Sequence, residues 1–257
     1  MRKIRKTFII SVMAVTVLSM SVVVAPEVGA AASAGDLIKM DGLSSVYYLG
    51  ADSKRYVFPN EKTYFSWYGD FSSVVTIPQS ELEGYALAAN VTVRPGTKLV
   101  KITTNPNVYA VKPNGNLILI PDETTAKALY GDSWAQRVID VPDSFFTNYT
   151  IAAGELASTA YPEGSLIQLP DTTEVYYIDA DGKARLISNE AALTANRFKM
   201  GDIVTTAAGF VLPATGDAIS TTNVTITDTS QGGGALPGAQ PGAGTGLTVA
   251  LASDTPA

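Results

Sequence analysis

The chain has 257 residues, a formal net charge of −6 and a hydrophobic fraction of 46%. This length and composition suffice for one or two domains with a hydrophobic core and argue against global disorder. The chain contains no Cys and no His, which excludes disulfides, thiolate metal sites and His-dependent acid–base catalysis. We therefore expect no enzyme activity and no catalytic, cofactor-binding or metal-binding residues. The acidic surface disfavours nucleic acid and anionic lipid as partners.

The first 30 residues have the pattern of a secretory signal peptide. Basic residues within the first six positions precede an apolar run over residues 8–25, and small residues suited to a signal peptidase follow at positions 28–32. An uncleaved anchor helix is the alternative, because the run approaches the roughly 18–20 apolar residues that cross a bilayer. The sequence thus predicts an extracellular or cell-surface location, with membrane contact only through this segment.

One pattern then recurs three times at closely related spacing. Each copy begins with a Gly followed by a short apolar run, continues with a Val-Tyr pair, and reaches a Glu fifteen positions after that Val. The Val–Glu pairs are Val46 and Glu61, Val108 and Glu123, and Val175 and Glu190. The opening glycines are Gly35, Gly96 and Gly164. Three such gap-free alignments indicate internal repeats.

In the first copy, residues 37–39, 46–49 and 56–58 are short, β-branched or aromatic runs, which predicts three strands. We expect the second and third strands of each copy to pair antiparallel. Asn60, Asp122 and Asn189 stand where helix N-caps belong, which predicts helices over about 61–68, 123–130 and 190–198. A final short strand is expected at 74–78, 138–142 and 203–204.

The hairpin turns differ between the copies. Asn114 with Gly115, and Asp181 with Gly182, can supply the positive φ that a tight turn needs, so both pairs are expected in left-handed conformations. Copy one has Asp52 and Ser53 at this place and no Gly. It is expected to use a looser turn or to place Asp52 in the left-handed conformation.

One unit buries too little apolar surface to be stable alone, so the copies should pack together. The predicted fold is α+β and β-rich, with three tandem β-β-β-α-β repeats at about 35–78, 96–142 and 164–204 in one domain over 35–213. Residues 214–246 have the composition of a Thr/Gly/Pro-rich linker. Strand-like alternation resumes at 247–257, which predicts the start of a further β domain in a longer protein.

The unit resembles a repeat of extracellular bacterial proteins, with the outline Gly-x-Leu-Ile/Val-Lys, then Val-Tyr, then Asp-Gly-Lys-x-Arg and an apolar residue before Pro-Asn. Residues 35–39, 46–48 and 54–60 carry it best, whereas copy two lacks the Lys/Arg pair. Together with the signal segment, the linker and residues 248–256, the arrangement is similar to the N-terminal region of S-layer-like surface proteins. The resemblance implies an envelope role without identifying a ligand.

An aromatic-dense stretch lies at the first helix, and Tyr64, Trp67 and Tyr68 are our candidate glycan contacts because aromatic faces can stack on sugar rings. The alternative is core packing, since Tyr130 and Phe198 occupy corresponding places in the other copies.

Two acidic patterns are further candidate sites. Residues 179–182 have the first ligands of a calcium loop but lack the later ones, which favours a plain hairpin turn. Glu81 and Glu83 have the residue type of a glycosidase pair, but nothing places an acid opposite a nucleophile, which favours ordinary exposed carboxylates.

These observations predict a non-catalytic, S-layer-like structural protein of the cell surface, whose partner is a cell-envelope polymer or another copy of the chain. The alternative is a module that binds carbohydrate or cell-wall polymer and targets a downstream enzyme.

Overall fold

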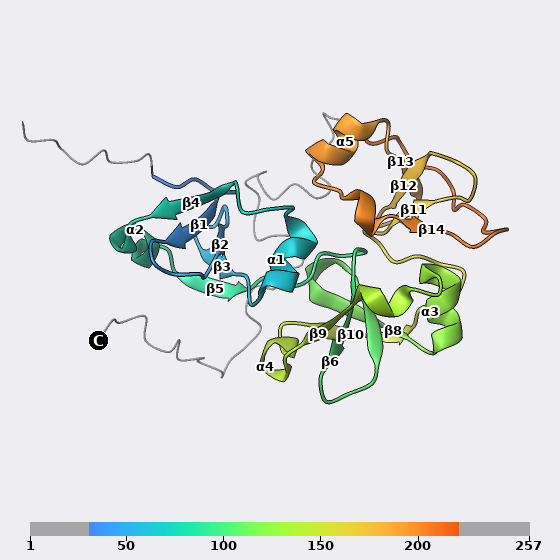
Figure 1. Ribbon diagram of the computed structural model, residues 1–257, viewed down its shortest axis with the longest axis horizontal. Coiled ribbons are helices and arrows are strands. Elements are labelled where there is room, and N and C mark those ends of the chain that lie inside the picture. The colour runs from blue at the N-terminus through green and yellow to red at the C-terminus, as the bar shows by residue number, and fades with distance from the viewer. Residues whose placement is uncertain (1–30, 221–257) are drawn as a thin grey trace, which may run out of the picture. The chain divides into compact units, whose positions relative to one another are not determined.

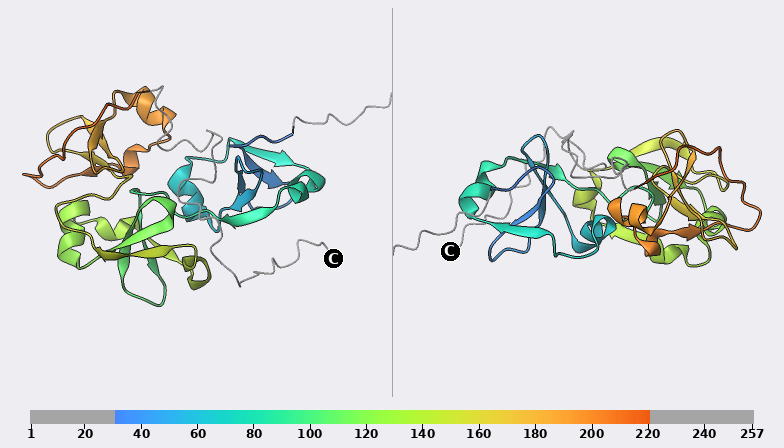
Figure 2. Two further views of the ribbon diagram at one scale, coloured as in Figure 1. Left: turned by 180° about the vertical axis from the view of Figure 1, so that it is seen from behind. Right: turned by 90° about the horizontal axis from the view of Figure 1, so that it is seen from above.

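The computed structural model describes residues 31–220, which fall in one compact unit (Figure 1). Three separate mixed sheets follow one another along the chain, each built from the strands of a single copy (Figure 2). The strand orders are β4-β1-β2-β3-β5, β10-β8-β7-β6-β9 and β13-β12-β11-β14. The predicted β-rich α+β fold with three repeated units is confirmed.

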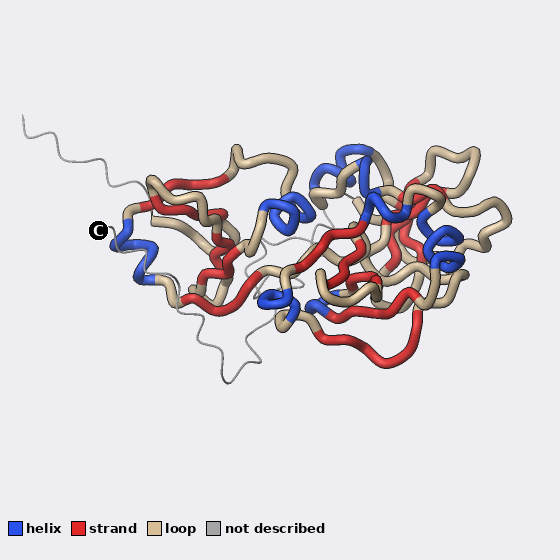
Figure 3. The backbone as a smooth tube through the Cα atoms, turned by 60° about the horizontal axis from the view of Figure 1, so that its bottom comes forward, coloured by secondary structure: helices blue, strands red, loops and turns tan. Residues whose placement is uncertain are grey.

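The elements are short, and each copy has three strands before its first α-helix (Figure 3). The strands are β1 (Leu37–Met40), β2 (Tyr47–Leu49), β3 (Arg55–Val57), β4 (Val74–Ile77), β5 (Leu87–Asn90), β6 (Leu99–Ile102), β7 (Val108–Val111), β8 (Asn116–Ile120), β9 (Val138–Val141), β10 (Thr150–Glu155), β11 (Leu166–Gln168), β12 (Val175–Ile178), β13 (Ala184–Leu186) and β14 (Val204–Thr205). The α-helices are α1 (Glu61–Trp67), α2 (Gln79–Gly84), α3 (Glu123–Tyr130), α4 (Asp143–Phe146) and α5 (Glu190–Ala195). The 3₁₀ turns are η1 (Pro113–Gly115), η2 (Trp134–Arg137) and η3 (Met200–Asp202).

All three copies use the same strand register. The first strand of each copy pairs antiparallel with the second, placing Leu37 opposite Tyr48, Leu99 opposite Ala110 and Leu166 opposite Tyr177. The second and third strands form the expected antiparallel hairpin in every copy. After the helix, β4, β9 and β14 return parallel to the first strand of their own copy. The gap-free sequence alignment is therefore a structural alignment as well.

The three predicted helix caps are confirmed. The side-chain oxygens of Asn60, Asp122 and Asn189 accept hydrogen bonds from the backbone N–H three residues later, at 2.8, 2.7 and 2.8 Å. Each bond satisfies one of the N–H groups that a helix leaves without an intrahelical partner at its start. The helices α1, α3 and α5 thus begin where the sequence indicates.

The hairpin turns follow the prediction in part. Asn114 and Gly115 are both left-handed, with φ of 59° and 69°, and Gly182 has φ of 73°. Asp181 does not have a positive φ, so only the Gly of that pair is left-handed. In copy one the left-handed residue is Ser53, with φ of 58°, rather than Asp52. Ser53, Gly115 and Gly182 occupy the same place in the three turns. Each has a positive φ because the tight turn reverses the chain between the paired strands at this residue.

Each copy extends further than predicted, because one more segment runs parallel to its third strand. β5 pairs with β3, and β10 pairs with β8. In copy three, residues 215 and 219 form parallel bridges with Ala184 and Ile187, and Ile219 is fully buried. The segment 214–219, expected in the linker, therefore completes the third sheet. With these additions the copies run over residues 35–90, 96–156 and 164–219, named here copy one, copy two and copy three.

Copies two and three share a hydrophobic core. Leu99, Leu129 and Tyr130 of copy two lie in one cluster with Ile167 and Ile178 of copy three. Copy one has its own clusters on both faces of its sheet. The predicted packing of the copies against one another is closest between copies two and three.

The predicted signal segment 1–30, the linker from residue 221 onward and the predicted strand-like start at 247–257 lie outside the described residues.

Candidate functional site

Tyr64, Trp67 and Tyr68, the candidate glycan contacts, lie in the core of copy one. Their exposed fractions are 2%, 2% and 7%. The indole N–H of Trp67 donates to the backbone carbonyl of Thr92 at 2.8 Å, and the Tyr64 hydroxyl donates to that of Asp70 at 2.7 Å. Burial raises the pKa of Tyr64 to about 12. Most of this aromatic surface therefore packs inside copy one. Of the three residues, only Tyr64 lines a surface hollow where a sugar could stack.

A hollow of about 380 Å³ lies beside Tyr64, named here the copy-one hollow. Its aromatic wall is formed by Phe58, Tyr64 and Phe71, and the Phe71 ring stacks on Tyr64 with centroids 4.4 Å apart. Phe71 is 47% exposed, so it offers the accessible aromatic face that Trp67 and Tyr68 do not. The remaining lining residues are Ser44, Ser45, Val46, Pro59, Asn60 and Glu61.

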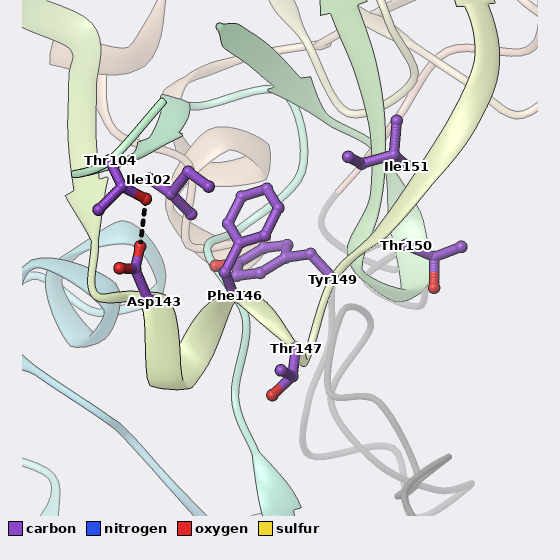
Figure 4. A pocket seen from close by; sticks show the side chains of 8 residues that line it. All are labelled: Ile102, Thr104, Asp143, Phe146, Thr147, Tyr149, Thr150 and Ile151. Atoms are coloured by element: carbon purple, nitrogen blue, oxygen red, sulfur yellow. Dashed lines mark hydrogen bonds between the residues drawn. The ribbon is translucent and has the colours of Figure 1, made fainter. Parts of the chain in front are cut away.

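A larger hollow of about 520 Å³ lies in copy two, named here the copy-two hollow (Figure 4). Its lining residues are Ile102, Thr104, Asp143, Phe146, Thr147, Tyr149, Thr150 and Ile151. Figure 4 shows the Phe146 and Tyr149 rings side by side, and their centroids are 5.8 Å apart. The Thr104 hydroxyl donates to the Asp143 carboxylate at 3.1 Å. The aromatic and aliphatic faces suit ligand binding by apolar contact, and the threonine hydroxyls and the Asp143 carboxylate add polar groups to the lining.

The copy-two hollow was missed in the sequence because α4 and β10 were not predicted. A second repeated motif marks them, since Pro78 and Tyr85 in copy one have the same spacing as Pro142 and Tyr149 in copy two. Each Tyr hydroxyl forms a hydrogen bond with the backbone of the residue three positions before the opening Gly of its copy. Tyr85 donates to the Ala32 carbonyl at 3.2 Å, and Tyr149 accepts the N–H of Val93 at 2.9 Å. Burial raises the pKa of Tyr149.

Glu81 and Glu83 lie on helix α2, and each accepts a hydrogen bond from another part of the fold or of the helix. Glu81 accepts the backbone N–H of Ala32 at 2.7 Å, and Glu83 accepts from the Gln79 side-chain amide at 2.6 Å. Glu81 thereby holds the segment that precedes β1.

The acidic turn at residues 179–182 satisfies its own backbone. One oxygen of Asp179 accepts the N–H of Asp181 at 3.0 Å and that of Lys183 at 2.8 Å. Within residues 31–220, no group of three or more metal-ligating side chains is close enough to hold an ion.

A polar junction connects the copies around Arg94, which is 2% exposed. Its backbone N–H donates to the Ser66 hydroxyl of copy one at 2.9 Å, and its guanidinium donates to the carbonyl oxygens of Asn196 (2.9 Å) and Arg197 (2.5 Å) in copy three. The guanidinium also lies over the ring of Phe198, with its central carbon 5.0 Å from the centroid. Burial lowers the pKa of Arg94 to about 10. Arg94 thus joins the ends of two helices from different copies, α1 through its backbone N–H and α5 through its guanidinium.

Comparison with protein-family models, with curated proteins and with solved structures gave no match for this chain. Within residues 31–220, no helix is both long enough and apolar enough to cross a bilayer.

Proposed function

We propose that this chain is a non-catalytic structural protein of the bacterial cell surface, similar to S-layer proteins. In this proposal the three-copy domain anchors the protein to an envelope polymer or assembles with other copies of itself. The signal-like N-terminal segment and the resemblance of the repeat to extracellular bacterial proteins support this location.

The observation that carries the proposal is the connection of three equivalent units into one array. Copies two and three share a core, and Arg94 connects copy one to copy three. Repeat arrays present similar surfaces at several places, an arrangement suited to extended polymers and to assembly.

Fractionation of cells that produce the native protein tests the location. We expect the protein in the envelope fraction, released by treatments that extract surface polymers rather than by cell lysis alone. A cytosolic or freely secreted product would contradict the proposal. Sedimentation of the purified chain over a range of concentrations separates self-assembly from polymer anchoring, because only self-assembly makes the mass depend on protein concentration.

The second candidate function is binding of carbohydrate or cell-wall polymer on behalf of a downstream enzyme. The exposed Phe71 ring at the rim of the copy-one hollow favours it. Titration with soluble peptidoglycan fragments tests this function, and Phe71→Ala should weaken binding at least about fivefold, because aromatic stacking contributes about 1 kcal/mol. Ile151→Ala is the matched control, since Ile151 is exposed in the copy-two hollow. Equal affinity of both variants and the unmodified chain would exclude the copy-one hollow as the site.

A further inference from the structure

Basic residues gather at one place in this acidic chain, where the three copies meet. The members of this junction cluster are Lys62, Arg94, Lys98, Arg137, Arg197 and Lys199. One ion pair involves it, in which the Lys98 ammonium lies 3.2 Å from the Asp202 carboxylate. Among residues 31–220, none of the ion pairs includes Lys62, Arg137 or Lys199. The cluster therefore carries a local excess of positive charge.

Part of the junction cluster lines a hollow of about 300 Å³, named here the junction hollow. Lys62 comes from α1 of copy one, and Lys98 and Arg137 come from copy two. Lys62 is exposed, and the other two are partly exposed. Glu61 is the one carboxylate among the residues that line the hollow, and the other lining residues are Phe65, Gln136, Val138 and Ile139.

Backbone carbonyl oxygens bind the side chains of Arg137 and Lys199 and leave their positive charges without a carboxylate partner in an ion pair within residues 31–220. The Arg137 guanidinium donates to the carbonyl oxygens of Asp202 and Ile203 at 3.3 and 3.0 Å, and to that of Thr97 at 3.4 Å. The Lys199 ammonium donates to the carbonyl oxygen of Phe65, which lines the hollow. Because a guanidinium has five N–H donors, these contacts leave Arg137 able to donate to a further acceptor.

The charge environment favours an added anion. Burial lowers the pKa of Lys199, and the positive charges of Arg94 and Lys98 lower it further, while Asp202 opposes them. Neighbouring cations of this kind repel one another, and an anion placed among them offsets the repulsion. Arginine and lysine are also the side chains that bind phosphate and carboxylate groups most strongly.

We propose that the junction hollow binds a phosphate or carboxylate group carried by an anionic cell-envelope polymer. That the anion belongs to an envelope polymer rests on the proposed surface function, whereas the anion site itself rests on the geometry of Lys62, Lys98 and Arg137. The site needs residues of two copies together, so it exists only in the packed array.

Calorimetric titration of the full chain with two polymer probes, polyphosphate and poly-L-glutamate, tests the site, and uncharged dextran serves as the polymer control. We expect binding that weakens as salt increases, because a partly exposed site is screened. Lys62→Glu should reduce the affinity at least about tenfold, because it replaces an attractive charge by a repulsive one. Thermal unfolding of Lys62→Glu should stay close to that of the unmodified chain, because Lys62 is exposed and forms no ion pair with any residue of 31–220.

Lys127→Glu is the matched control. It makes the same change of charge on the exposed surface of α3, outside the junction hollow. Although this variant also breaks the ion pair of Lys127 with Glu123, its affinity should change less than about twofold. An equal loss in both variants would show a general charge effect and overturn the site, as would the absence of polyanion binding. The preferred probe identifies the group, phosphate or carboxylate.

Binding of the same variants to isolated envelopes separates this inference from the proposed function. If the unmodified chain and Lys62→Glu bind envelopes equally, the junction hollow is not the anchor, although the surface function stands. If polyanion binding depends on Lys62 but the chain does not bind envelopes, the anion site stands and the surface function fails.

Discussion

At the level of single residues, the opening glycines of copies two and three set how closely these copies approach. Both have positive φ, 71° for Gly96 and 93° for Gly164. A Cβ on Gly96 would lie 2.0 Å from the carbonyl carbon of Gly164, and one on Gly164 would lie 2.7 Å from the carbonyl oxygen of Pro95. The backbones of two copies therefore touch where any side chain would separate them.

We predict that Gly96→Ala destabilises the protein much more than Gly131→Ala. Gly131 has nearly the same φ, 74°, but apart from its two chain neighbours no atom of residues 31–220 lies within 4 Å of its added Cβ. Its substitution should cost about 1–3 kcal/mol for the backbone alone, because φ of 74° with ψ of −179° is adopted almost only by Gly. Gly96→Ala should cost about 1–3 kcal/mol more because the packing must open. Urea unfolding at neutral pH measures both. Similar losses would mean that copies two and three do not meet at these glycines.

The left-handed turn residues predict opposite effects in copies one and three. Ser53→Gly should be neutral or stabilise the protein by up to about 1 kcal/mol, because Gly adopts positive φ without steric cost. Gly182→Val should destabilise it by about 1–2 kcal/mol or more, because a β-branched side chain is strained there although the space is open. Thermal unfolding of the two variants tests this pair. A harmless Gly182→Val together with a strongly destabilising Ser53→Gly would contradict the turn alignment.

At the level of elements, the helices depend on their caps because they are short. Helix α1 has seven residues and α5 has six, and isolated helices below about 12 residues are marginal in water. A capped start and burial of one face therefore decide whether they form. The N-cap is Asn in copies one and three but Asp in copy two, which gives copy two a titratable cap.

The Asp122 cap predicts a pH-dependent contribution to stability. Hydrogen bonds from the backbone and side chain of Thr125 lower the pKa of Asp122. A carboxyl with a lowered folded-state pKa stabilises the protein above its unfolded-state pKa, and this contribution is lost as the pH falls through the folded-state value. The difference in unfolding free energy between the unmodified chain and Asp122→Asn should therefore be present at pH 7 and shrink toward acid pH.

A control for this titration uses the neutral caps. Asn60→Ala should cost about 1 kcal/mol, and this cost should change little with pH because Asn does not titrate. Urea unfolding at pH 7 and below pH 4 compares both variants. A pH-independent effect of Asp122→Asn would show that the carboxylate charge does not support the cap.

At the level of the whole molecule, Arg94 connects copies that are distant in sequence. Its guanidinium reaches Asn196 and Arg197, more than a hundred residues later, and its central carbon lies 5.5 Å from the centroid of the Trp67 ring of copy one. These contacts satisfy carbonyl oxygens after α5 that the helix itself leaves free. Copy one and copy three are thereby expected to unfold together.

We predict that Arg94→Met lowers the free energy of unfolding by about 1–3 kcal/mol, because the carbonyls of buried Asn196 and half-buried Arg197 lose their hydrogen bonds from Arg94 while the volume is largely kept. Urea unfolding followed by tryptophan fluorescence measures the change next to Trp67. Arg185→Met is the control, since Arg185 donates to the Asp217 carbonyl in an exposed hydrogen bond, and it should change stability by less than about 0.5 kcal/mol. Equal effects of both variants would contradict the role of Arg94.

The predicted parts of the fold were those with local signals. The side chains of the N-caps Asn60, Asp122 and Asn189 each accept a hydrogen bond from an N–H three residues away. The hairpin turns likewise join strands that are adjacent in sequence. The fifth segment of each sheet was missed because its partner strand lies about thirty residues earlier, as in the pairing of β5 with β3. Its sequences, such as Leu87–Asn90, have no strong β-propensity, so only the partner makes them strands.

The candidate site shows the same division. The aromatic stretch at α1 was visible in the sequence, but the burial of Trp67 and Tyr68 depends on strands and loops that pack over them. The junction hollow was not visible at all, because Lys62 and Arg137 are distant in the chain and neither belongs to a motif.

The sequence by itself determined the three-fold repetition, the strand–strand–strand–helix order and the caps, because each depends on the chemistry of neighbouring residues. Only the tertiary structure decided the fifth strand position, the contact of Gly96 with Gly164, and the position of Arg94 at the centre of the junction. These features depend on which distant surfaces exclude water together, and burial is a property of the packed molecule rather than of any segment. The excess of positive charge in the junction cluster also follows from that packing.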